Sequence, residues 1–132
     1  FKVTHPETRP EHLRELAKHS HHMIRLRVAE HPELPHDVMH DLAGDDHSEI
    51  RIAVSEHPSA SDAILDVLVK DPNPDVRYAL AENANIPVRI LRRLTEDENA
   101  YVSHRASKTL RLVEKHSASA LEQNSNISKK IG

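Results

Sequence analysis

The chain contains no cysteine, which excludes disulfide bonds, thiolate-bound metals, iron–sulfur ligation by cysteine and a cysteine nucleophile. It has only two glycines, too few for a glycine-rich loop that cradles phosphate groups. Aromatic residues make up 2% of the 132 residues and tryptophan is absent, so few side chains could stack on an exposed nucleic-acid base. The composition argues against several classes of enzyme.

No run approaches the roughly 18 apolar residues of a membrane helix, so we expect no membrane span. Eighteen lysines and arginines face 21 aspartates and glutamates, a net charge of −3, which lacks the basic excess that drives phosphate binding. We therefore expect no nucleic-acid partner. The lack of cysteine suits a reducing compartment and predicts a cytoplasmic protein. The chain starts at Phe1 within a repeat, which suggests one domain of a longer protein.

The sequence repeats at an interval of 26 residues without gaps, so that residues 25–50 align with 51–76 and with 77–102. Three sets of identical residues follow this interval: Leu16, Leu42, Leu68 and Leu94; Glu30, Glu56 and Glu82; and Asp45, Asp71 and Asp97. His-Pro pairs recur at residues 5–6, 31–32 and 57–58, and Asn83 takes the place of the histidine in the next copy. The period indicates a solenoid of stacked repeats.

Each copy reads as two short helices. The first is predicted over Ser48–Glu56 and must end at His57, because the residue before a proline disfavours the helical conformation. Histidine or asparagine at that position suggests a left-handed backbone at the helix end. The second helix is predicted to begin near Pro10, Pro35, Ser61 or Pro87, to span about two turns and to be partly 3₁₀.

These features predict an all-α, right-handed superhelical solenoid of about four two-helix repeats with a C-terminal capping helix. The solenoid is assigned to residues 1–116, with the last helix ending near His116, and a polar tail to residues 117–132. The apolar tail residues, Leu121, Ile127 and Ile131, suggest that the tail docks on a groove of its own chain or of a neighbour. His12 replaces the apolar residues Val38 and Ile64 of later copies, as expected for a solvent-facing outer layer.

The segment DPNPDVRYALAENANIPVRILRRL resembles the repeat unit of the leucine-rich repeat variant family, a relative of the HEAT repeats. The resemblance covers about residues 3–113. It implies a right-handed superhelix of alternating α- and 3₁₀-type helices. It does not imply the iron–sulfur module known in this family, because this chain has no cysteine to ligate a cluster.

The constant aspartates and the arginines that follow them, Arg51 and Arg77, are expected to form a structural ladder between layers, as in HEAT-like repeats. Functional residues are expected instead on the second helices, where residues vary between copies. We assign partner binding there to six residues: His36, His40, Asp66, Arg89, Arg92 and Arg93. This surface is acidic and histidine-rich in the middle and basic toward Arg93.

The 12 histidines raise the question of a metal site. His36 and His40 lie one turn apart, and His19, His21 and His22 are expected one layer from His47. The equivalent His5, His31 and His57 stand about one helix spacing apart, too far to share an ion bound at about 2 Å. We predict no metal, no cofactor and no catalytic residue; a pH-dependent switch through the histidines remains an alternative.

The sequence thus predicts a non-catalytic module that binds a protein or peptide on the concave face formed by its second helices. The alternative from another class is a HEAT-like, nucleic-acid-processing enzyme resembling the DNA glycosylases.

Overall fold

The computed structural model describes the backbone of residues 8–131 and the side chains of residues 8–121. Within residues 8–131 every regular element is a helix. The helices are α1 (Pro10–Leu16), α2 (His22–Ala29), α3 (His36–Leu42), α4 (Ser48–Glu56), α5 (Asp62–Leu68), α6 (Pro74–Ala81), α7 (Val88–Leu94) and α8 (Ala100–Ile131). His5 lies outside the described residues.

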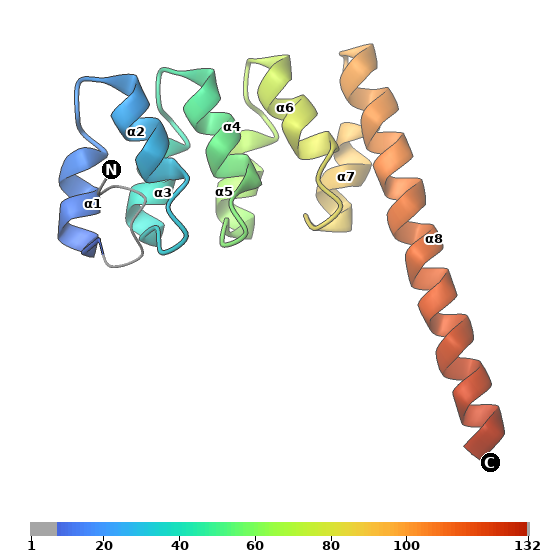
Figure 1. Cartoon of the computed structure of the whole chain (residues 1–132). Helices are drawn as coiled ribbons and strands as arrows, with labels where there is room; N and C mark the ends of the chain where they lie inside the picture. The colour runs from blue at the N-terminus through green and yellow to red at the C-terminus, as the bar shows by residue number, and fades with distance from the viewer. Residues whose placement is uncertain (1–7, 132) are drawn as a thin grey trace. The chain divides into compact units, whose positions relative to one another are not determined.

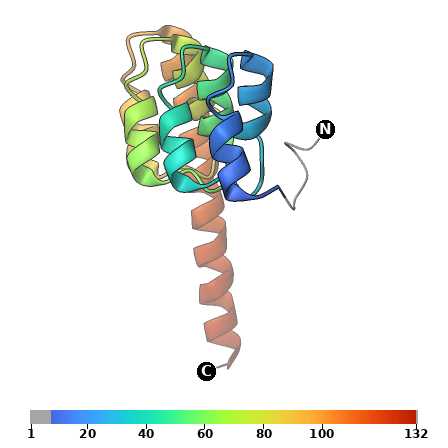
Figure 2. The same ribbon diagram turned by 90° about the vertical axis from the view of Figure 1, so that its left-hand side faces the viewer.

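The chain divides into two compact units, one up to Leu80 and one from Ala81 onward. In the first unit, α2 and α4 lie side by side in one row, and α6 continues this first row (Figure 1). The helices α1, α3 and α5 form a second row and follow one another in the turned view (Figure 2). Each 26-residue copy contributes one helix to each row, as the period predicts.

Local sequence signals account for the helix boundaries. The predicted first helix of the repeat is found over Ser48–Glu56, and it ends where His57 adopts an extended backbone before Pro58. In α5, the Ser61 hydroxyl accepts a hydrogen bond from the Ile64 N–H at 3.3 Å and so caps the helix. The second helices are seven-residue α-helices, not partly 3₁₀ as predicted.

The core consists of the apolar columns that the repeat predicted. Leu42, Leu68 and Leu94 are at most 2% exposed, whereas Leu16 in the outermost layer is only half-buried. His12 is exposed, as expected for a capping layer. Burying one leucine contributes roughly 1.5 to 3 kcal/mol, but only where a neighbouring helix covers it. A short helix of this kind would therefore not be stable in isolation.

The prediction of a left-handed backbone at the histidine column is wrong. No non-glycine residue of the described chain has a positive φ, and His57 has φ −68° and ψ 128°. Histidine is present at this position for its side chain, because the imidazoles of His31 and His57 are buried.

In the second unit, α7 packs against α8. The capping helix was predicted to end near His116, but α8 continues to Ile131, since residues 117–131 contain no proline or glycine that would end it. Leu121 is 69% exposed on α8 and is not docked on this chain, while the side chains of Ile127 and Ile131 lie outside the described residues. The right-handed twist stays a prediction.

No helix in the described part of the chain combines the length and apolarity needed to cross a membrane.

Candidate functional site

A ladder of arginine–aspartate pairs in the first unit joins each first-row helix to the turn that precedes the next one. The Arg25 Nε lies 2.8 Å from Asp45 Oδ2, and Arg51 Nε lies 2.7 Å from Asp71 Oδ2. A second nitrogen of each guanidinium reaches the other carboxylate oxygen, at 3.3 and 3.2 Å. Both pairs are bidentate and largely shielded from solvent, so the expected ladder exists between these layers.

The same side chains also hold the turns that precede the first-row helices. Arg51 donates to the backbone carbonyl of Asp45 at 2.7 Å, and Asp45 accepts a hydrogen bond from the His47 N–H at 3.0 Å. Desolvation opposes ionisation of Asp45, but the hydrogen bonds from Arg25 and from the His47 N–H outweigh it, so the pKa of Asp45 is lowered. The ladder residues therefore have a structural role.

The buried histidines connect neighbouring copies in a similar way. The Nδ1 atom of His57 accepts a hydrogen bond from the Ser59 N–H at 3.1 Å, so its Nε2 carries the proton and donates to the His31 carbonyl at 2.8 Å. His31 Nδ1 accepts from the Glu33 N–H at 3.0 Å in the same manner. Each of these histidines stabilises its own turn by a hydrogen bond to the backbone, and His57 also bonds to the turn of the preceding copy.

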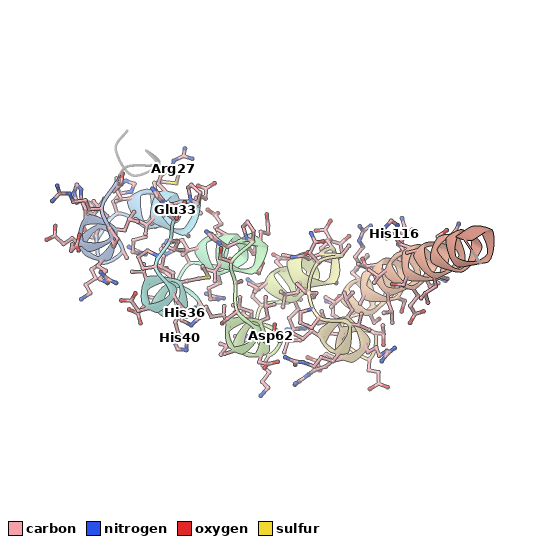
Figure 3. The ribbon with its side chains drawn as sticks, turned by 90° about the horizontal axis from the view of Figure 1, so that it is seen from below. Arg27, Glu33, His36, His40, Asp62 and His116 are labelled. Carbon is pink, nitrogen blue, oxygen red and sulfur yellow. The ribbon has the colours of Figure 1, made fainter. Side chains whose placement is uncertain are left out.

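Three of the predicted binding residues lie on the second row of the first unit. His36 and His40 project together from α3, away from α2, whereas Arg27 projects from α2 on the opposite side (Figure 3). Asp66 is half-buried on α5 and already takes part in a polar interaction. We call His36, His40 and Asp66 the histidine–aspartate patch.

The other three predicted residues, Arg89, Arg92 and Arg93, lie on α7 of the second unit, and all are exposed. We call them the arginine patch. Arg92 lies 4.0 Å from the Glu114 carboxylate of α8, and Arg89 is also engaged in an interaction. Glu114 was not among the site residues predicted from the sequence.

The outer face of the second row also carries a pair that spans two layers. Arg14 on α1 binds Asp37 on α3 through bonds of 2.8 and 3.2 Å. The hydrogen bond from Arg14 lowers the pKa of Asp37, and desolvation opposes this only partly. Both side chains remain about half exposed, so this pair stays accessible to a partner.

The histidines near the start of the first row stack instead of ligating. The rings of His22 and His47 have centroids 4.5 Å apart and planes 6° from parallel, and His21 stacks on His22 at 5.3 Å. Among the residues that the structure describes, no three histidine, aspartate or glutamate side chains are placed to share a metal ion.

A hollow of about 300 Å³ lies between the C-terminal ends of α2 and α4 and was not predicted. Its lining comes from both helix ends and the turns that follow them: Ala29, Glu30, Pro32, Ala53, Glu56, His57 and Pro58. One signal could have revealed it, namely the constant glutamate column at Glu30, Glu56 and Glu82, which is exposed and so cannot be explained by the core.

Comparison with known proteins agrees with the repeat. Residues 23–84 match the model of the Leucine Rich Repeat Variant domain. No curated protein and no solved structure shows significant similarity to the chain. The matched segment runs from α2 into α6 and contains both complete ladder pairs of the first unit. Over residues 23–84 this chain is thus similar to a Leucine Rich Repeat Variant domain.

Proposed function

We propose that this chain is a non-catalytic, cytoplasmic protein-interaction module. Its partner is a protein or peptide that binds the outer faces of the second helices of the repeats, the side that is concave in solenoids of this kind. The histidine–aspartate patch would supply the contacts in the first unit, and the arginine patch would supply contacts in the second unit by itself.

One observation supports the proposal most directly. The constant arginines, aspartates and leucines serve the scaffold, as the ladder pairs and the buried leucines show. The equivalent position of the second helices instead holds His40, Asp66 and Arg92 in successive copies, three side chains of different charge. Variation on an accessible face of a constant scaffold is typical of repeat proteins that bind other proteins.

The test is photo-cross-linking. A photoreactive residue at His40 or at Arg92 is expected to cross-link a partner in extract of the native source, and one at the exposed Glu49 at the start of α4 is not. Replacing Arg89, Arg92 and Arg93 by glutamate should then lower the affinity for the captured partner by at least about tenfold. Equal cross-linking from all three positions would contradict the assigned face.

The alternative, a nucleic-acid-processing enzyme, has no support, because neither the matched domain nor any described residue favours it.

A further inference from the structure

The hollow between α2 and α4 combines two features that together favour a cation. Its rim holds two carboxylates, Glu30 and Glu56, and among the residues that the structure describes no lysine or arginine lines it. Both ring nitrogens of His57 already bond to the backbone, Nδ1 to the Ser59 N–H and Nε2 to the His31 carbonyl. Arg27 lies 3.4 Å from Glu30, and both side chains are about half exposed, so this pair leaves Glu30 accessible.

The helix ends add to this negative potential. The hollow lies at the C-termini of α2 and α4, where the helix dipole leaves a partial negative charge. A basic residue in the last turn usually compensates for it, but α4 has none. Glu56 also makes no ion pair with any residue that the structure describes. An external cation would meet uncompensated charge here.

The walls favour a cation on an aliphatic stem over a free ion. Ala29 and Ala53 leave room between the helices, and Pro32 and Pro58 form apolar walls on the two turns. The methylene groups of a lysine or arginine can pack on such walls while the charged head stays near the rim carboxylates.

We propose that this hollow binds a basic side chain, lysine or arginine, of a partner protein. The inference rests on the proposed function only in that the ligand belongs to a protein, since the hollow is formed by the first row and not the second. It also gives the constant glutamate column a role that neither the ladder nor the core provides. Neighbouring helices stand about 8 to 10 Å apart, so basic residues three positions apart in an extended segment, about 10 Å, match successive glutamates.

The experiment titrates the full chain, labelled with nitrogen-15, with a blocked hexapeptide that carries two lysines separated by two glycines. We expect saturable, salt-sensitive shifts of the Ala29, Glu30, Ala53 and Glu56 amide signals. The same peptide with norleucine in place of both lysines keeps the aliphatic stems but not the charge, and it should not bind. Equal binding of the two peptides would overturn the proposal.

Matched variants locate the site. Glu56→Gln is expected to weaken the lysine peptide about two- to fivefold, and Glu30→Gln similarly, as for an accessible ion pair. Glu49→Gln removes the same charge from the other end of α4 and should leave the affinity unchanged. Equal effects of Glu49→Gln and Glu56→Gln, or shifts that depend on protein concentration without peptide, would overturn it. Charge reversal of the arginine patch should not alter peptide binding, so failure here and failure of the second-row face are distinguishable.

Discussion

Two sets of arginine–aspartate pairs in the first unit share one geometry but differ in their surroundings. Arg25–Asp45 and Arg51–Asp71 on the ladder and Arg14–Asp37 on the outer face are all bidentate, with shortest distances of 2.7 to 2.8 Å. The side chains of the Arg51–Asp71 pair are 14% and 5% exposed, whereas those of Arg14–Asp37 are 46% and 61% exposed. Bond length alone cannot distinguish the scaffold pair from the surface pair.

The comparison shows that the environment decides what such a pair contributes. In the ladder, each arginine also donates to a backbone carbonyl, and each aspartate also accepts a backbone N–H. Loss of one partner there leaves a shielded charge and loosens a turn. On the outer face, water replaces a lost partner at little cost.

The largest effect is expected from Asp71→Ala, which leaves the guanidinium of Arg51 shielded and unpaired and frees the Asn73 N–H. We expect a loss of about 3 kcal/mol in the free energy of unfolding, the low end for a buried pair because Arg51 retains some contact with solvent. Urea unfolding followed by circular dichroism measures it. Asp46→Ala, an exposed aspartate in the preceding turn, is the matched control and should change the midpoint little. Equal losses from both substitutions would refute the distinction.

The next effect concerns the histidine column. His57→Ala removes the donor to the buried turn at His31 and the acceptor for the Ser59 N–H, and we expect a loss of about 2 kcal/mol. His57→Asn should lose only about half as much. The chain itself shows why, since Asn83 at the equivalent position accepts the Asn85 N–H at 2.9 Å. Unfolding midpoints that are the same for both variants would mean that the hydrogen bond within the turn contributes nothing.

A smaller effect concerns how the stability contributed by the Arg25–Asp45 pair depends on pH. The pKa of Asp45 is lowered in the folded chain from its ordinary value of 3.8, so the unfolded chain takes up this proton first as the pH falls. The stabilisation is present above pH 3.8 and is lost as the pH falls from there through the folded pKa. Asp45→Asn should therefore melt well below the wild type at neutral pH and approach it in acid. A constant difference in melting temperature across this range would contradict the assignment.

The smallest effect is expected from Arg14→Ala and Asp37→Asn on the outer face. Neither should shift the urea midpoint measurably at physiological salt, because both side chains are hydrated and screened. A double-mutant cycle should give a coupling energy below about 1 kcal/mol, as for other exposed pairs. A coupling as large as that of Arg51 with Asp71 would show that exposure does not separate the two sets.

Much of the scaffold follows from the sequence. The interval of 26 residues predicted which leucines are buried, where α4 begins and ends, and that the constant aspartates and arginines pair between layers. Short amphipathic helices need one another to bury their apolar side, so periodicity alone predicts the arrangement. The polar composition of residues 117–132 predicts a tail outside the helix, but α8 continues to Ile131 because it contains no proline or glycine that would end it.

The candidate sites were less predictable. His36 and His40 were correctly paired on one helix, since their spacing of four residues determines a shared face. Whether they and the arginine patch bind a partner stays a prediction. The hollow beside Glu56 could not be read from any one copy, because its walls come from two helix ends and two turns that only stacking brings together.

By itself the sequence determined the period, the helical class and the identity of the buried columns, because hydrophobic burial depends on the pattern of residue types. Only the tertiary structure decided what the polar residues of that pattern do. The value of a charge or an imidazole depends on its solvent exposure and on the group that a neighbouring layer places opposite it, as with the carbonyl of His31 opposite His57.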